Sequence, residues 1–520
     1  MTGFVIRKNE YYDSVFLMRV AKRISEQKGV LQAAALMATE KNKVLLAAIG
    51  IRGAEISAAT PNDLVVALRG DSQQTVAAVL QNIERWLCPE DASGPPSEVR
   101  TLEEAVARQP RSNLAFISVP GEYAAREARK ALEHGLNVFL FSDNVPLESG
   151  RSLKEFARER GLIVMGADCG TALIGGVGVG CANVVRPGPI GVIGASGTGI
   201  QEFTALVHRA GSGISHAIGT GSRDLSDAIG GISTRSALTA LECNTQTQVI
   251  AILSKPPGPL ALAHLVPRIN QCPKPVVACF LGLKKDFLHP NTRLKVARTL
   301  EEAAALAVQI ATGNRPSAFT IDSPDIPGLI LRERACMKPG QKYIRGIFAG
   351  GTFCYQAQQV LREAGMVVHS NVPLEGNPTL PDPRRSLEHT LVDMGADEFT
   401  AGRPHPMIDS RLRRERIVAE AQDPQVAILL LDFILGFNAS PDPAGELAHA
   451  IAEAKEAVKK KGGFLSVAAS VCGTEGDPQG LQRQTRLLEE EGVVVFPSSA
   501  RAALFCLGLA ASLQESSHAA

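Results

Sequence analysis

The 520-residue chain lacks the motifs that would assign it to several familiar enzyme classes. It has no GxxxxGK[ST] loop, no HExxH, no GxSxG elbow and no CxxC pair among its ten cysteines. These absences argue against P-loop nucleotide hydrolysis, zinc peptidase chemistry and serine hydrolysis, and the sequence assigns no metal site. The chain also lacks an apolar run approaching the ~20 residues that span a bilayer, and its first residues have no signal-peptide apolar region. We therefore expect no membrane contact and a cytoplasmic location.

Neither sign of charge is in excess, because 54 lysines and arginines face 53 aspartates and glutamates and leave a net charge of +1. A nucleic-acid partner is therefore not expected. Aromatic residues make up only 5%, whereas glycine occurs 48 times and hydrophobic residues reach 45%. This balance is typical of an α/β protein with many short turns between helices and aliphatic parallel strands. The length predicts several domains.

The order of apolar and amphipathic segments predicts four units. Residues 1–95 alternate strands and helices without glycine loops, which predicts a small α+β domain, and the polar stretch PEDASGPPSE (89–98) is interpreted as a linker. Residues 100–186 read as a Rossmann-like unit of three strands and their helices. Residues 187–315 and 340–512 each begin with a strand, a glycine turn and a helix, and continue as α/β units.

Two glycine-rich turns stand between an apolar strand and a helix. We expect both turns to bind an anion, because N–H groups and hydroxyls gather at the positive end of a helix. The first candidates, in PIGVIGASGTGIQE, are Gly194, Ala195, Ser196, Gly197, Thr198 and Gly199. The second, in KYIRGIFAGGTFCY, are Gly350, Gly351 and Thr352. Either turn alone is better explained by tight packing, but the pair predicts one shared phosphate or carboxylate site.

Further candidates follow other predicted strands. The loop GTGSRDLS offers Ser222, Arg223 and Asp224 for substrate binding, since arginine can hold a carboxylate or phosphate with two parallel bonds. An exposed loop ion pair is the alternative. Lys255 follows the strand VIAILS, with an ordinary surface lysine as the alternative interpretation, and Gly473 and Thr474 are predicted to complete the rim of the second turn.

Arg403-Pro404-His405-Pro406 is the strongest catalytic candidate. Prolines on both sides would stiffen the loop around His405, and histidine suits proton transfer near neutral pH. Arg403 would neutralise a phosphate. We therefore expect His405 and Arg403 to be catalytic, the former moving the proton.

From about Leu114 to Leu507 the order of motifs resembles succinyl-CoA synthetase. The motifs are SDNVPLES, GADCGT, GVIGASGTGIQE, GTGSRDLS, SKPP, GGT, GRPHPMID and CGTEGDP. The chain resembles the α subunit fused to the C-terminal ligase domain of the β subunit, and it is identified as a member of the FdrA family. The resemblance implies a CoA-binding-type domain and two flavodoxin-like ligase-type domains. In the synthetase the two matching helix starts stabilise a phosphohistidine loop.

The chain departs from the synthetase in three places. The segment KKDFLHPNTRL, with His289, lacks the glycine-flanked phosphohistidine. A nucleotide-grasping domain is missing, so ATP is not expected to be bound by this chain alone. The glycine loop of the CoA-binding domain has no counterpart in residues 1–100, so CoA is left open and no cofactor is assigned.

Three functions follow from this pattern. The first is an FdrA-like subunit of a carbamoyltransferase, which would use carbamoyl phosphate and an oxamate-like amide in purine or allantoin nitrogen catabolism. The second is an acyl-CoA synthetase that works with a nucleotide-binding partner. The third is a non-catalytic, metabolite-sensing regulator. We expect a small phosphate-activated substrate, partner subunits and an oligomer, and leave the acceptor open.

Overall fold

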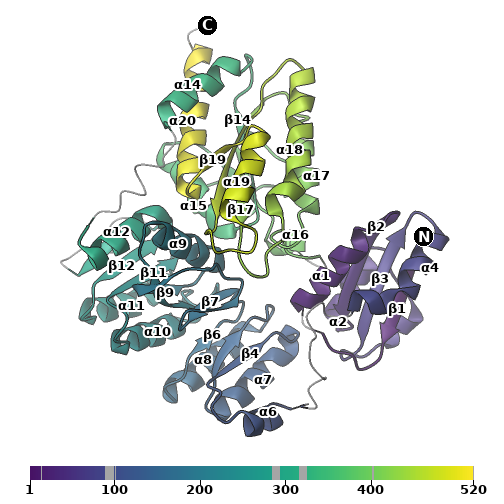
Figure 1. The fold of residues 1–520 in the computed structure, drawn as a ribbon, viewed down its shortest axis with the longest axis vertical. Helices are drawn as coiled ribbons and strands as arrows, with labels where there is room; N and C mark the ends of the chain where they lie inside the picture. The colour runs from purple at the N-terminus through teal and green to yellow at the C-terminus, as the bar shows by residue number, and fades with distance from the viewer. Residues whose placement is uncertain are drawn as a thin grey trace.

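The computed structural model describes residues 1–12, 14–87, 99, 101–283, 293–314, 325–400 and 403–518. The expected linker at 89–98 and His289 lie outside these residues. Four sheets occur in the described part, and Figure 1 shows the corresponding four domains. The mixed α/β architecture with a small N-terminal domain confirms the predicted fold class.

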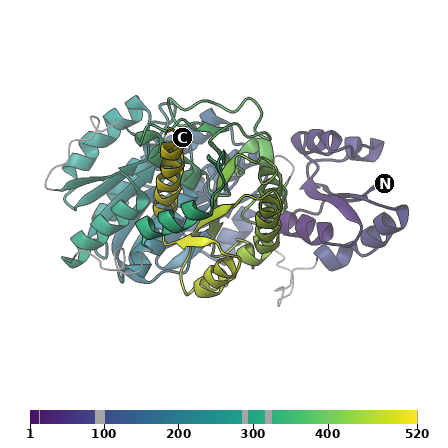
Figure 2. The same cartoon turned by 90° about the horizontal axis from the view of Figure 1, so that it is seen from above.

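The N-terminal domain has an antiparallel sheet in the order β1-β3-β2, formed by Thr2–Arg7, Leu64–Gly70 and Val30–Met37. Alternate residues of β3 point to opposite faces, as the pleat of a strand requires. Leu64, Val66 and Leu68 pack under α1 (Ser14–Ser25), α4 (Gln73–Gln81) and α5 (Ile83–Leu87). Val65 and Ala67 pack with α2 (Glu40–Ala48) and α3 (Ala54–Ala58). In Figure 2 this domain stands to one side of the other three.

The second domain is a small parallel sheet in the order β4-β5-β6, with strands at Leu114–Ile117, Asn137–Leu140 and Val164–Met165. Its helices are α6 (Leu102–Arg108), α7 (Gly121–Glu133) and α8 (Leu147–Glu159). The loops 118–120 and 141–146 follow β4 and β5 at the carboxyl edge of the sheet. This is the edge at which open α/β sheets bind ligands.

The third domain has a seven-stranded sheet in the order β13-β12-β11-β9-β10-β7-β8. Its parallel strands are β9 (Pro187–Gly194), β10 (Ile214–Gly219), β11 (Val249–Ser254), β12 (Val276–Phe280) and β13 (Leu294–Ala297). The antiparallel hairpin of β7 (Thr171–Ile174) and β8 (Val177–Gly180) pairs with β10, so this sheet begins before the expected boundary at residue 187. The helices are α9 (Gly197–Arg209), α10 (Ile232–Cys243), α11 (Pro259–Gln271) and α12 (Leu300–Thr312).

The fourth domain has a fully parallel sheet in the order β15-β16-β14-β17-β18-β19. Its strands are His369–Ser370, Thr390–Asp393, Tyr343–Phe348, Val426–Ile434, Ser466–Cys472 and Val494–Phe496 in that order. Its helices are α14 (Ile326–Cys336), α15 (Gly351–Glu363), α16 (Asp397–Thr400), α17 (Arg411–Glu420), α18 (Pro443–Lys460), α19 (Leu481–Glu490) and α20 (Ser499–His518). Among the described residues, no helix is long and apolar enough to cross a membrane.

One apolar core is shared by the third and fourth domains. Phe203 of α9, Phe353 of α15 and Phe505 of α20 are fully buried in it. Burial of such side chains contributes roughly 1.5–3 kcal/mol each, so this core holds the two domains in a fixed orientation. The shared core therefore fixes the positions of α9 and α15, the helices that follow the two glycine turns.

Candidate functional site

The two predicted glycine turns meet in the structure. Ser196 caps α9 by accepting a hydrogen bond from the Gly199 N–H at 3.1 Å. Its hydroxyl also hydrogen-bonds the hydroxyl of Thr352, in the first turn of α15. A Cβ added at Gly199 would lie 3.4 Å from Thr352 Cγ2, which is an ordinary van der Waals contact and shows how near the two helix starts are. The N-termini of two helices from different domains thus face one another.

Each helix start leaves donors for a ligand, because N–H groups in the first turn have no acceptor within the helix. In the described part of the chain, the N–H groups of Gly197 and Thr198 in α9 have no acceptor. The same holds for Gly351 and Thr352 in α15. Together with the positive ends of two helix dipoles, these four donors can bind one anion.

Gly350 has a different role from the expected one. Its N–H and that of Ala349 donate to the carboxylate of Asp432 in β17, at 2.7 and 2.8 Å. Asp432 is fully buried and forms an ion pair with Arg413 at 2.8 Å. A Cβ at Gly350 would lie 2.7 Å from the Phe353 ring. The Gly350 N–H is therefore bound to Asp432 and not available to a ligand. Gly350 has a structural role at the start of α15.

A second buried carboxylate, that of Asp393 at the end of β16, lies against the start of α15. A Cβ at Gly351 would lie 2.4 Å from Asp393 Oδ2. Burial raises the pKa of Asp393 to about 6, although the nearby charge of Lys255 acts in the opposite direction. The Lys255 ammonium lies 5.4 Å from the centre of the Tyr355 ring. Asp393 can therefore gain or lose a proton near neutral pH, next to the anion-binding donors.

His405 is half-buried beside the same helix start. Its Nδ1 accepts the Met407 N–H at 3.2 Å, and a Cβ at Gly395 would lie 2.7 Å from its Nε2. Burial and the charge of Arg413 lower the pKa of His405 to about 4. A neutral imidazole whose Nδ1 accepts a hydrogen bond carries its proton on Nε2. His405 is therefore suited to donate a hydrogen bond, whereas the sequence predicted a proton shuttle.

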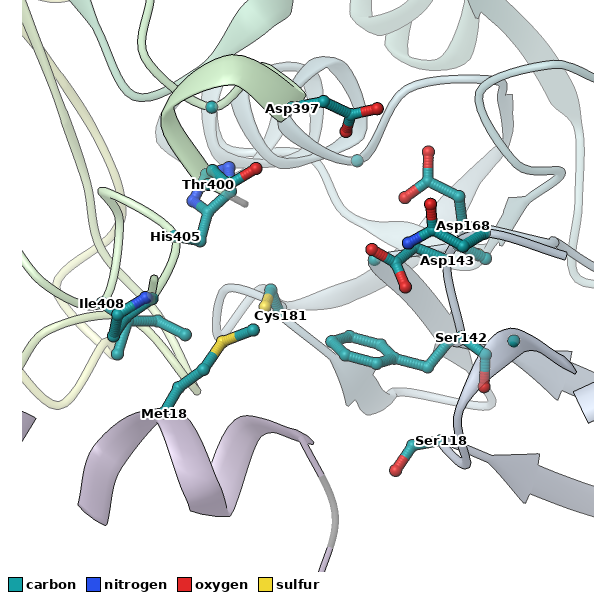
Figure 3. Close-up of a pocket in the computed structure, with 18 of the residues that line it drawn as sticks. Met18, Ser118, Ser142, Asp143, Asp168, Cys181, Asp397, Thr400, His405 and Ile408 are labelled. Carbon is teal, nitrogen blue, oxygen red and sulfur yellow. The ribbon is translucent and has the colours of Figure 1, made fainter. Parts of the chain in front are cut away.

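The helix starts open into a cavity of about 990 Å³. The predicted site residues that line it are Gly194, Ala195, Ser196, Gly197, Thr198, Ser222, Lys255, Gly351, Thr352, Arg403 and His405. The N-terminal domain also contributes to the lining, through α1, β2 and α2. Figure 3 shows His405 and Asp397 across the cavity from Asp143 and Asp168, with Met18 reaching in from α1. The sequence did not predict that the N-terminal domain would form part of this wall.

Other predicted residues do not line this cavity. Gly199 and Gly350 support the helix starts, as described above. The Arg223 guanidinium donates to the Val145 carbonyl at 3.1 Å, away from the cavity. Thr474 hydrogen-bonds the Val184 carbonyl at 2.6 Å, and neither it nor Gly473 reaches the cavity.

Asp224, expected to bind substrate, is instead buried in an ion pair with Lys154 of α8 at 2.7 Å. The same ammonium donates to the Thr220 carbonyl and to the Ser233 hydroxyl, at 2.8 and 3.0 Å. This network joins the second domain to the third, so Asp224 has a structural role.

The carboxylates of Asp143, Asp168 and Asp397 also line the cavity. Asp168 accepts a hydrogen bond from the Ser222 hydroxyl at 2.5 Å. Asp168 is exposed and lines the cavity. Burial raises its pKa, and the charges of Asp143 and Asp397 act in the same direction. Among the described residues, no cluster of histidine, cysteine and carboxylate side chains could hold a metal ion.

Two carboxylates that shape the site, Asp393 and Asp432, were not among the predicted site residues. Asp393 ends a parallel strand and Asp432 lies near the end of another. Ligands gather at the carboxyl edge of such sheets, which is the signal that could have found them.

Three family models match parts of the chain. Residues 1–101 match "AllF, heavy metal-associated domain", residues 185–278 match "CoA binding domain" and residues 347–506 match "CoA-ligase". The CoA-binding match falls on the third domain, whereas the sequence predicted a CoA-binding-type unit at 100–186. Residues 1–101 contain one cysteine, Cys88, and no histidine. Heavy metals are bound mainly by thiolate and imidazole, so this domain does not fit a heavy-metal site.

Individual proteins also match parts of the chain, among them one curated sequence and one solved structure. The "Succinate--CoA ligase [ADP-forming] subunit alpha" of Methanothermobacter thermautotrophicus is 27% identical over 188 residues, covering 36% of this chain and 62% of that subunit. The ATP citrate lyase of Methanothrix soehngenii matches 80% of this chain and 85% of its own, at 14% identity and a TM-score of 0.35, which is too weak to show a shared fold. These matches leave the FdrA assignment a prediction.

Almost the whole chain is matched by YahF of Escherichia coli strain K12, described as an uncharacterized protein. The two are 42% identical over 501 residues, which cover 96% of this chain and 97% of YahF. The chain therefore belongs to the same protein family as YahF, and it has the CoA-binding and CoA-ligase architecture of the succinyl-CoA synthetase type.

Proposed function

We propose that the protein is the ligase-type subunit of an acid–CoA ligase, which binds an acyl phosphate between the starts of α9 and α15 and transfers the acyl group to the thiol of CoA. The observation that carries this proposal is the meeting of the two helix starts at Ser196 and Thr352. The CoA-binding and CoA-ligase family matches support it. The proposal replaces carbamoyl transfer, the first of the three functions inferred from the sequence, as the leading candidate.

Each group of the site has a role in this transfer. The N–H groups of Gly197, Thr198, Gly351 and Thr352 bind the phosphate, and the Lys255 ammonium offsets its charge. The Nε2–H of His405 donates to the acyl oxygen as negative charge develops on it. The carbon–sulfur bond forms as the carbon–oxygen bond to phosphate breaks, which releases inorganic phosphate. Asp393 is suited to accept the thiol proton, because its pKa is about 6.

The cavity is compatible with CoA as the acceptor. Its volume of about 990 Å³ is at the upper end of the range for small-molecule and cofactor sites. Lys255 and the exposed Arg403 are cationic residues that line it, and CoA would supply the attacking thiol. We propose that the acyl phosphate is made with ATP on a nucleotide-binding partner subunit. The relative from Methanothermobacter thermautotrophicus is a subunit alpha by name, which supports such an assembly.

Thioester formation tests the proposal. The purified chain, alone and with the products of neighbouring genes, is incubated with CoA and acetyl, butyryl or benzoyl phosphate, and thioester and phosphate are measured together. The proposal predicts equimolar thioester and phosphate, and loss of both in Thr198→Asp. Absence of thioester with every acyl phosphate and every partner would refute it.

Carbamoyl transfer to an amide is the second candidate, and the acidic side of the cavity favours it. The carboxylates of Asp143, Asp168 and Asp397 suit an acceptor that presents N–H groups better than one that carries phosphates. Carbamoyl phosphate with oxamate should then release phosphate in an oxamate-dependent and CoA-independent manner. CoA dependence of phosphate release would contradict this second candidate.

A further inference from the structure

The N-terminal domain is fixed over the cavity by contacts with two other domains. The Tyr11 hydroxyl donates to the Ser118 carbonyl of the second domain at 2.9 Å. Lys22 donates to the Ile408 carbonyl at 2.9 Å and forms an ion pair with Glu446 of the fourth domain. Figure 1 shows α1 beside the part of the fourth domain that holds α16 and α17. The domain is therefore positioned by specific polar contacts.

Most of the residues that this domain turns to the cavity are apolar, although Thr39, Glu40 and Asn42 also line it. Tyr12, Leu17, Met18 and Leu36 line the cavity from α1, β2 and the segment before α1. Met18 is half-buried and its side chain points into the cavity toward Cys181 (Figure 3). Methionine adapts its shape to varied apolar groups, and an apolar wall in a ligand cavity favours an apolar part of the ligand.

Apolar side chains also occur on the facing wall, beside the carboxylates of Asp143, Asp168 and Asp397. Phe141 follows β5, Cys181 follows β8, and Met407 and Ile408 come from the loop after His405. The cavity thus has an anion-binding end at the two helix starts and an apolar part beneath the N-terminal domain. A ligand that fills both parts carries a phosphate at one end and a hydrocarbon or aromatic group at the other.

We infer that the N-terminal domain selects the organic group of the phosphate-activated substrate, and that this group is apolar. This inference rests on the proposed function, because it takes the phosphate to bind at the starts of α9 and α15. It also gives a role to a domain whose residues do not fit a metal site. Acyl phosphates with short aliphatic or aromatic groups are then bound more tightly than small or charged ones.

Stable phosphonates test the inference without turnover. Methylphosphonate and butylphosphonate are titrated into the full-length protein by calorimetry, and the ratio of their dissociation constants is measured. Each buried methylene is worth about fourfold in affinity, so three of them give up to roughly fiftyfold tighter binding of butylphosphonate. Met18→Asp should bring the ratio close to one, and Met18→Ala should reduce it severalfold.

Leu31→Asp is the matched control, because Leu31 is 60% exposed on the same domain and does not line the cavity. It should keep the wild-type ratio. If Met18→Asp fails to fold, as judged by circular dichroism, Met18→Ala decides the question. Equal binding of the two phosphonates to the wild type, or a ratio unchanged by Met18→Ala, would overturn the inference and leave the proposed function standing. Failure of both phosphonates to bind would overturn the proposed function itself.

Discussion

An aspartate at position 198 should separate anion binding from stability. Thr198 is the second residue of α9, lines the cavity and offers a free N–H. A carboxylate there interacts favourably with the helix dipole, by about 0.3–1 kcal/mol. It also lies within about 4–6 Å of any phosphate bound by that N–H. With an effective dielectric constant of about 20, repulsion costs about 3–4 kcal/mol per negative charge on the phosphate.

This cost corresponds to at least a hundredfold to thousandfold weaker binding. Calorimetric titration of butylphosphonate into wild type and Thr198→Asp measures it, and thermal unfolding checks that the melting temperature is unchanged or higher. Thr198→Asn is the control, because asparagine has the shape of aspartate without its charge. This variant should bind butylphosphonate with an affinity within about tenfold of the wild type. Undiminished phosphonate binding by Thr198→Asp would refute the assignment of the α9 start as an anion site.

Three further predictions concern buried ionisable groups. Burial raises the pKa of Glu202 from 4.5 to about 7, so the folded state holds this proton more tightly than the unfolded state. Stability should therefore fall as pH rises from about 4.5 to 7, by about 3 kcal/mol, and urea unfolding at several pH values should show this loss in wild type and not in Glu202→Gln. Asp432→Asn leaves Arg413 buried without a charge partner and should cost about 3–5 kcal/mol in urea unfolding, whereas Asp382→Asn, in an exposed pair, should cost under about 1 kcal/mol. His405→Ala should lower kcat about a hundredfold or more, and His405→Gln, which keeps an N–H donor, should lower it by about tenfold or less; equal losses would indicate proton transfer.

The sequence predicted the elements of the site because glycine turns after aliphatic strands have a local cause. Gly194 shows this: a Cβ there would lie 2.4 Å from Ile200 in the helix that follows. The residue type, the strand and the helix are neighbours in the chain, so spacing alone indicates the turn. The small N-terminal domain was also predicted, because the succession of apolar strands and amphipathic helices is a local pattern too.

Contacts between residues far apart in the chain could not be predicted from the sequence. No local pattern tells that the Gly350 N–H is taken by Asp432, or that Asp224 pairs with Lys154 of another domain. The burial that lowers the pKa of His405 arises from the packing of the whole fourth domain. The sequence also did not predict that α1 and β2 line the cavity with apolar side chains, because an apolar helix face normally packs on its own domain. These features depend on tertiary packing, which residue spacing does not encode.

The central claim is that one anion binds between the starts of α9 and α15, and a crystal structure with butylphosphonate tests it most directly. The account predicts phosphonate oxygens about 3 Å from the N–H groups of Thr198 and Thr352, with the butyl group near Met18. A phosphonate bound elsewhere at saturating concentration, with both helix starts left without an anion, would contradict it.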